Sequence, residues 1–133
     1  MFNLHGKTVL ITGSSRGIGR AALLAMAQQG ACVIMHCSRP SAPAEETVAA
    51  LEAMGADYRV VYQDLSKRGG ADELYEKVTG MGLTVNVLVL NASGGMEQGV
   101  AEDYAMQLNR DAQVNALETA LPLLGPGARI VFV

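Results

Sequence analysis

The stretch K-T-V-L-I-T-G-S-S-R-G-I-G at residues 7–19 constrains the fold of this chain more than any other part of it. Its apolar letters V-L-I predict a short buried strand, three glycines follow, and a helical run over 21–29 comes directly after. A strand, a glycine-rich turn and a helix in this order bring backbone N–H groups and the positive end of a helix dipole to one point. The stretch therefore predicts a phosphate-binding turn. A tight strand-to-helix turn without a ligand is the alternative.

The composition indicates the number of domains and excludes some classes of partner. The 133 residues, half of them hydrophobic and 17% charged, suit one globular domain over 1–133. A net charge of −3 supplies no basic field for nucleic acid. No apolar run approaches the roughly 20 residues that span a membrane, and the first residues lack the apolar core of a signal peptide. We therefore expect a cytoplasmic protein that binds neither nucleic acid nor membrane.

The two cysteines give no sign of a disulfide or a metal site. Cys32 and Cys37 lie in one expected strand, and their odd separation places them on opposite faces. They form no C-x-x-C pair, and together with His36 they do not have the spacing of metal ligands. We expect both to be small core residues and expect no metal.

Apolar runs alternate with helical segments along the whole chain. Strands are expected at 7–12, 31–37, 58–62, 85–90 and 129–133. Helices are expected at 17–29, after a break at Pro40 and Pro43 up to Gly55, at 71–79, and over most of 102–124. The second helix carries an apolar stripe at Val48, Leu51 and Met54, and Gly125-Pro126-Gly127 is expected to end the last helix.

The expected strands are continuous apolar runs, which is typical of a parallel sheet covered on both faces. Right-handed crossovers then predict a Rossmann-like, doubly wound α/β sheet in the strand order 3-2-1-4-5. Ligands of such sheets bind at the carboxyl ends of the strands, where the order reverses. Gly13 and Asn91 should therefore face one crevice.

Four motifs in order resemble the short-chain dehydrogenase/reductase family. T-G-S-S-R-G-I-G at 12–19 is similar to the family's T-G-x-x-x-G-x-G turn, and Asp64-Leu65 is similar to its acid-plus-apolar pair after the third strand. L-N-A-S-G at 90–94 resembles its N-N-A-G, and Asn115 falls where its catalytic asparagine would be. Asn109 competes for that role but is less well spaced from Asn91. The resemblance covers essentially the whole chain.

The sequence also departs from the family pattern. Leu90 and Ser93 replace an Asn and a Gly of N-N-A-G. The family's Ser after strand 5 and its Tyr-x-x-x-Lys pair are missing, because no tyrosine of this chain is followed four residues later by lysine. We therefore expect the N-terminal portion of a longer protein, which would add strands 6 and 7 and form a homodimer or homotetramer. The 133-residue chain alone is expected to be inactive.

The resemblance assigns a role to each motif position. The expected cofactor-binding residues are Gly13, Ser14, Ser15, Arg16, Gly17, Ile18, Gly19, Ser38, Arg39, Asp64, Leu65, Asn91, Ala92 and Ser93, and the expected catalytic residue is Asn115. For Asp64 the alternative is a helix cap or loop carboxylate, for Asn91 an Asx-turn, and for Asn115 a structural polar residue. His36 is expected to be an ordinary strand residue.

The end of the second expected strand bears on the choice of cofactor. An NAD enzyme carries Asp or Glu there for the ribose 2′-OH, but this chain has Ser38-Arg39. A guanidinium pairs with a phosphate that a carboxylate would repel, so Arg16 and Arg39 favour NADP(H) over NAD(H). Two solvated surface arginines are the alternative.

The resemblance implies an oxidoreductase that transfers a hydride between the nicotinamide and a carbonyl or alcohol carbon of a small substrate. The second hypothesis is a non-catalytic dinucleotide-binding sensor or regulatory protein on the same fold. A flavodoxin-like phosphate or FMN binder fits the glycine turn but not Asp64 and Asn91.

Overall fold

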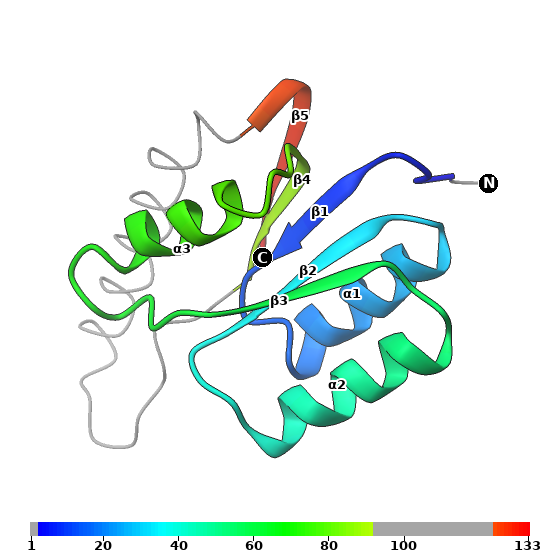
Figure 1. Ribbon diagram of the computed structural model, residues 1–133, viewed down its shortest axis with the longest axis horizontal. Coiled ribbons are helices and arrows are strands. Elements are labelled where there is room, and N and C mark those ends of the chain that lie inside the picture. The colour runs from blue at the N-terminus through cyan, green and yellow to red at the C-terminus, as the bar shows by residue number, and fades with distance from the viewer. Residues whose placement is uncertain (1–2, 92–123) are drawn as a thin grey trace.

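The computed structural model describes residues 3–91 and 124–133, and these form a parallel sheet with helices on both faces (Figure 1). The strands are β1 (Thr8–Ile11), β2 (Cys32–Cys37), β3 (Tyr58–Tyr62), β4 (Val85–Leu90) and β5 (Leu124–Phe132). The helices are α1 (Gly17–Gln28), α2 (Ala42–Ala53) and α3 (Gly70–Thr79). The sheet order is β3-β2-β1-β4-β5 and each neighbouring pair is parallel, which confirms the predicted Rossmann-like topology.

Two hydrophobic cores lie on opposite faces of the sheet. Alternate residues of β1 serve different cores, because side chains of a strand point to opposite faces in turn. Leu10 packs with Leu74 of α3, whereas Val9 and Ile11 pack with Leu23 of α1. Helices α1 and α2 accordingly cover one face and α3 covers the other (Figure 1). Burial on both faces explains why the strands read as unbroken apolar runs.

Helix α2 begins earlier than the prolines suggested. Ser41 is its N-cap and accepts a hydrogen bond from the Ala44 N–H at 3.3 Å. Pro43 lies inside the first turn, so the prediction that it breaks the chain was wrong. The backbone N–H of a residue in the first turn has no acceptor within the helix. Proline, which lacks this N–H, is therefore tolerated there. Of the predicted stripe, Leu51 is fully buried, but Met54 stands at the C-cap and is exposed.

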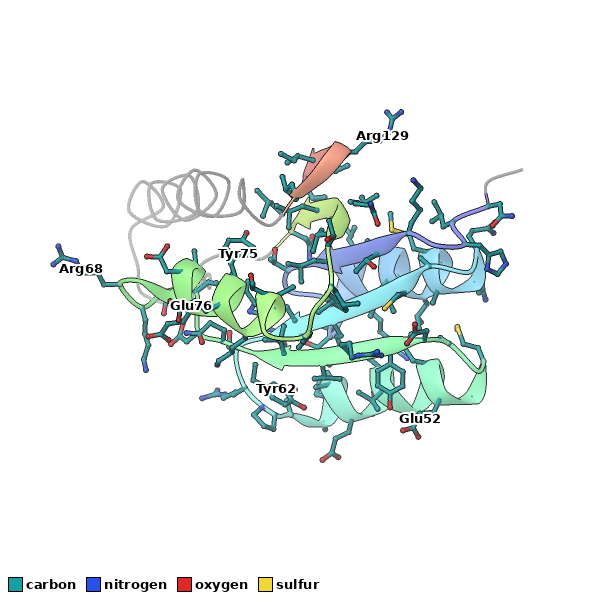
Figure 2. All side chains as sticks on the ribbon, turned by 45° about the horizontal axis from the view of Figure 1, so that its top comes forward. Glu52, Tyr62, Arg68, Tyr75, Glu76 and Arg129 are labelled. Carbon is teal, nitrogen blue, oxygen red and sulfur yellow. The ribbon has the colours of Figure 1, made fainter. Side chains whose placement is uncertain are left out.

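Strand β5 corrects the expected end of the last helix. Gly125-Pro126-Gly127 lies within β5 and does not terminate a helix at Leu124. The register passes from Val85–Leu124 to Val87–Arg129, so the Gly-Pro-Gly segment is extra chain in β5 that has no partner in β4. Such an irregularity admits a proline in a strand, because the proline need not donate to the ladder. Beyond it Arg129 points away from the sheet (Figure 2).

The remaining part of the helix predicted over 102–124 lies outside the described residues. Cys32 and Cys37 are both free thiols. No helix among residues 3–91 and 124–133 is long and apolar enough to cross a membrane. The same residues contain no cluster of His, Cys, Asp and Glu suited to a metal ion.

Candidate functional site

The glycine turn joins β1 to α1 at the carboxyl edge of the sheet. Gly13 and Gly17 have φ angles of 64° and 63°, a region that side chains other than glycine rarely adopt. A Cβ built on Gly17 would meet no atom within 4 Å, so the space above this part of the turn is open. The two glycines therefore set the path of the turn, and among the described residues the space beside Gly17 is open.

Gly19 makes the closest approach in the turn. A Cβ there would lie 2.5 Å from the Gly13 carbonyl oxygen and 2.5 Å from Asn91 Nδ2. Asn91 Nδ2 donates a hydrogen bond of 3.1 Å to the same Gly13 oxygen, and the Asn91 N–H donates to Thr12 Oγ1 at 3.0 Å. The predicted proximity of Gly13 and Asn91 is confirmed. Asn91 here ties the end of β4 to the turn after β1.

The first turn of α1 has no side-chain cap. Its N-cap is Arg16, in an extended conformation, and the first turn carries no acidic residue. The first N–H groups of any helix lack an intrahelical acceptor. Because the helix dipole adds positive potential at the same place, the start of α1 is suited to an anion. Ile18 stands beside these amides with 70% of its surface exposed, which leaves an apolar side chain at the edge of the turn.

Two serines of the turn are held by neighbouring elements. Ser14 Oγ donates to the Ile11 carbonyl at 2.8 Å, and the Ser14 N–H donates to the His36 carbonyl at 2.9 Å. The Ser15 carbonyl accepts from Thr47 Oγ1 of α2 at 2.8 Å. Ser14 and Ser15 are both buried, so their groups brace the turn, and the amides that follow them are better placed for a ligand.

Ser38 and Arg39 follow β2 at the same edge of the sheet and are exposed. They directly follow Cys37, the last residue of β2. Arg16 is also exposed. The positive charge of Arg39 reaches Asp64, whose carboxylate it helps to stabilise.

Asp64 and Leu65 follow β3 and start the connection to α3. Asp64 Oδ1 accepts hydrogen bonds from the Ser66 N–H at 2.9 Å and from Ser66 Oγ at 2.6 Å. These bonds lower the pKa of Asp64, and the charges of Lys67 and Arg39 lower it further. Asp64 Oδ1 thus forms an Asx-turn with the backbone of Ser66, two residues later. This oxygen therefore has the role of a loop carboxylate, which was the expected alternative.

Gly70, the first residue of α3, lets the connection at Asp64-Leu65 approach the helix closely. A Cβ on Gly70 would clash with the Asp64 carbonyl oxygen and lie 3.1 Å from Leu65 Cα. Leu65 is partly buried and packs against the core that contains Leu74. Gly70 was not predicted to have a role, although a glycine at the start of a helix is a signal that the sequence contains.

His36 is the main residue of this region that sequence reasoning missed. It lies near the end of β2, is 2% exposed, and its ring touches both flanking strand ends. Nδ1 accepts a 3.0 Å hydrogen bond from the Gly13 N–H, and Nε2 is 2.8 Å from the Gln63 carbonyl oxygen. Burial lowers the pKa of His36, a hydrogen bond to the Gln63 backbone opposes this, and the charge of Lys77 lowers it further.

Comparison with known proteins agrees with this geometry. The model of the short chain dehydrogenase family matches residues 7–133. The chain belongs to the short-chain dehydrogenase/reductase family. A short-chain dehydrogenase/reductase homolog of Bacillus subtilis, YusS, is 35% identical over 91 residues, which cover 68% of this chain and 84% of that protein.

Longer members of the family are similar over most of this chain. The rhamnolipids biosynthesis 3-oxoacyl-[acyl-carrier-protein] reductase of Pseudomonas aeruginosa is 34% identical over 131 residues, which cover 92% of this chain and 50% of that protein. The crystal structure of a 3-oxoacyl (acyl-carrier-protein) reductase from Agrobacterium tumefaciens C58 with NADP bound superposes with a TM-score of 0.82 at 33% identity. That superposition covers 98% of this chain and 53% of the other. The chain therefore spans about half the length of these two relatives.

The structure brings most of the expected cofactor-binding residues to one edge of the sheet. The turn at 13–19, Ser38-Arg39, Asp64-Leu65 and Asn91 all follow the carboxyl ends of neighbouring strands. Ala92, Ser93 and the expected catalytic Asn115 lie outside the described residues, as does Asn109. Their roles stay predictions.

Proposed function

We propose that this chain is the dinucleotide-binding portion of an NADP(H)-preferring short-chain dehydrogenase/reductase. The whole protein would transfer a hydride between the nicotinamide and a carbonyl or alcohol carbon of a small substrate, and would assemble as a homodimer or homotetramer. The observation that carries the proposal is the start of α1, which has no side-chain cap and has open space at Gly17; Arg16 is its exposed N-cap, and exposed Arg39 follows β2 at the same edge of the sheet. NADP bound to the similar Agrobacterium reductase supports the same choice of cofactor.

The residues of the site fit such a cofactor in distinct ways. The first-turn amides of α1 would hold the diphosphate, since they lack intrahelical acceptors and lie at the positive end of the helix dipole. Arg39 would pair with the ribose 2′-phosphate, because a guanidinium binds a phosphate through parallel hydrogen bonds. Asp64 and Leu65 would contact the adenine. When bound, the nicotinamide supplies the hydride chemistry.

The residues expected to take part in catalysis differ from those that would bind the cofactor. Asn115 would support the proton relay, as the family resemblance implies. No tyrosine of the sequence is followed four residues later by lysine, so a Tyr-x-x-x-Lys pair is absent from the 133 residues. We therefore expect this chain by itself to bind the dinucleotide and to transfer no hydride.

The test is a fluorescence titration of the 133-residue chain with NADPH and with NADH. We expect NADPH to bind at least about tenfold more tightly, because a hydrogen bond to a charged partner is worth about 1.5–3 kcal/mol. Arg39→Glu should remove that preference. Arg129→Glu makes the same charge change on β5, where the side chain points away from the sheet (Figure 2), and should leave the preference intact. Equal affinity for the two cofactors refutes the NADP preference, and binding of neither refutes the proposed function.

A further inference from the structure

The ring of His36 spans the glycine turn and the end of β3. Strand β2 lies between β1 and β3 in the sheet, so a side chain near its carboxyl end can reach the segments that leave both neighbours. Toward β1, Nδ1 accepts from the Gly13 N–H at 3.0 Å. Toward β3, Nε2 lies 2.8 Å from the Gln63 carbonyl oxygen. Both ring nitrogens are therefore used, and each contacts a different strand end.

The partners of the ring determine its protonation state. The Gly13 N–H is a donor, so Nδ1 must be the unprotonated nitrogen. The Gln63 carbonyl is an acceptor, so Nε2 must carry the proton. Only the neutral imidazole with its proton on Nε2 satisfies both partners. A protonated ring would present an N–H to the Gly13 N–H, and that hydrogen bond would be lost.

The backbone of His36 strengthens its attachment to the turn. The His36 N–H donates to Ser14 Oγ at 3.1 Å, and the His36 carbonyl accepts from the Ser14 N–H at 2.9 Å. With the ring, His36 makes three hydrogen bonds to Gly13 and Ser14 and one to Gln63. Gln63 immediately precedes Asp64, so the ring joins the start of the proposed diphosphate site to the start of the proposed adenine site.

We infer that neutral His36 is a positioning residue for the dinucleotide, which holds the glycine turn and the end of β3 at the separation that its diphosphate and adenine require. The inference rests on the proposed function. It assigns His36 no contact with the ligand, since the ring is buried and both nitrogens are occupied by the protein. Loss of either hydrogen bond leaves a buried backbone group without its partner and frees one half of the site to shift.

Two charged groups of α3 contact Gln63 and the residue before it. Lys77 of α3 donates to Gln63 Oε1 and to the Tyr62 carbonyl, both at 2.8 Å, and Glu73 accepts from Gln63 Nε2 at 2.7 Å. The positive charge of Lys77 disfavours a second positive charge on the ring.

The other titratable groups near the ring lie on the remaining neighbouring segments. They are the thiol of Cys37 on β2, Arg16 in the turn, Arg39 after β2 and Asp64 after β3. Of these, Arg16 and Arg39 are exposed, and Asp64 is held by Ser66. The ring of His36 bridges the two strand ends, so acid should act on the site through His36.

The test measures the affinity of the 133-residue chain for NADP⁺ by calorimetry from pH 8 down to the lowest pH at which the chain stays folded, well below the unfolding temperature. His36→Gln can keep an acceptor and a donor but does not titrate. His36→Leu removes both hydrogen bonds of the ring and puts an apolar side chain in its place. At pH 8 we expect His36→Gln to bind within about threefold of the unchanged chain and His36→Leu to bind about tenfold more weakly.

The pH profile separates positioning from a general loss of stability. Because burial lowers the pKa of His36, the unchanged chain should lose affinity more steeply than His36→Gln only as the pH falls below that lowered pKa. In His36→Gln only the phosphates of the ligand and the other groups titrate. Leu51→Ala, a change in the fully buried part of α2, should lower Tm and keep the steep profile. Should His36→Leu fail to fold, the comparison with His36→Gln decides alone. The inference is overturned if His36→Leu binds as tightly as the unchanged chain at pH 8, or if the profiles of the unchanged chain and His36→Gln stay parallel through the pH at which the folded His36 ring becomes protonated. No binding by the unchanged chain at pH 8 overturns the proposed function.

Discussion

Replacement of Gly19 by alanine tests the packing on which the glycine turn depends. The new Cβ would lie 2.5 Å from both the Gly13 carbonyl oxygen and Asn91 Nδ2, and 3.1 Å from Ser14 Cα. Two of these neighbours are backbone atoms, so α1 must move away from β1. Overpacking of this kind costs roughly 1–3 kcal/mol, and loss of the hydrogen bond from Asn91 to Gly13 about 1 kcal/mol more. Alanine returns up to about 1 kcal/mol through its helix propensity.

The net effect of Gly19→Ala is a loss of about 2 kcal/mol in the free energy of unfolding. With an unfolding entropy of about 2.1 cal/mol/K per residue, this lowers the Tm of the 133-residue chain by about 7 °C. Circular dichroism melting measures the shift, and nucleotide binding should weaken as well because the first-turn amides move with α1.

Gly80→Ala is the matched control for the glycine change itself. Gly80 ends α3 with a φ of −63°, and a Cβ there would approach only the Glu76 and Lys77 carbonyl oxygens, at 3.4 Å. Its Tm should change by no more than about 2 °C, since the change adds a methyl group without a severe clash. A Gly19→Ala variant as stable as Gly80→Ala, with nucleotide affinity unchanged, would refute the close approach of α1 to β1 and Asn91.

Two further predictions concern contacts that brace the turn. Thr47→Val keeps the shape of a fully buried side chain but removes a hydroxyl that donates to the Ser15 carbonyl at 2.8 Å and also lies 2.9 Å from the Pro43 carbonyl oxygen. Urea unfolding should show a loss of about 1–2 kcal/mol, and an unchanged midpoint would contradict the role of this hydroxyl. Because the folded pKa of His36 lies below its unfolded value of about 6.5, the unfolded chain binds more protons below that pH. Stability should therefore fall as the pH drops below about 6.5, by up to about 1.4 kcal/mol per pH unit, until the folded pKa is reached. Urea titrations should show this slope reduced in His36→Gln, and identical slopes would count against a buried neutral histidine.

Much of the fold followed from local pattern alone. Strands β3 and β4 have the bounds predicted from their apolar runs, and β1 and β2 differ from prediction only at their ends. The meeting of Gly13 and Asn91 was also predictable, although they are 78 residues apart. The handedness of crossovers determines the strand order, and the order places the ends of β1 and β4 side by side.

Other features of the site required the tertiary structure. Gly13 and His36 are 23 residues apart, and Ser15 and Thr47 are 32 apart, and no motif in the sequence links either pair. The place of Gly-Pro-Gly within β5 was likewise missed, because local turn chemistry points to a break wherever these residues occur.

The sequence by itself determined the alternation of strands and helices, the glycine turn and the family to which the chain belongs. These depend on apolar periodicity, on glycine spacing and on motif order, all of which act over short stretches of chain. The tertiary structure decided which groups brace the turn and which are left for a ligand. A hydrogen bond such as that between Gly13 and His36 depends on how closely two strand ends pack, and only the folded backbone establishes that distance.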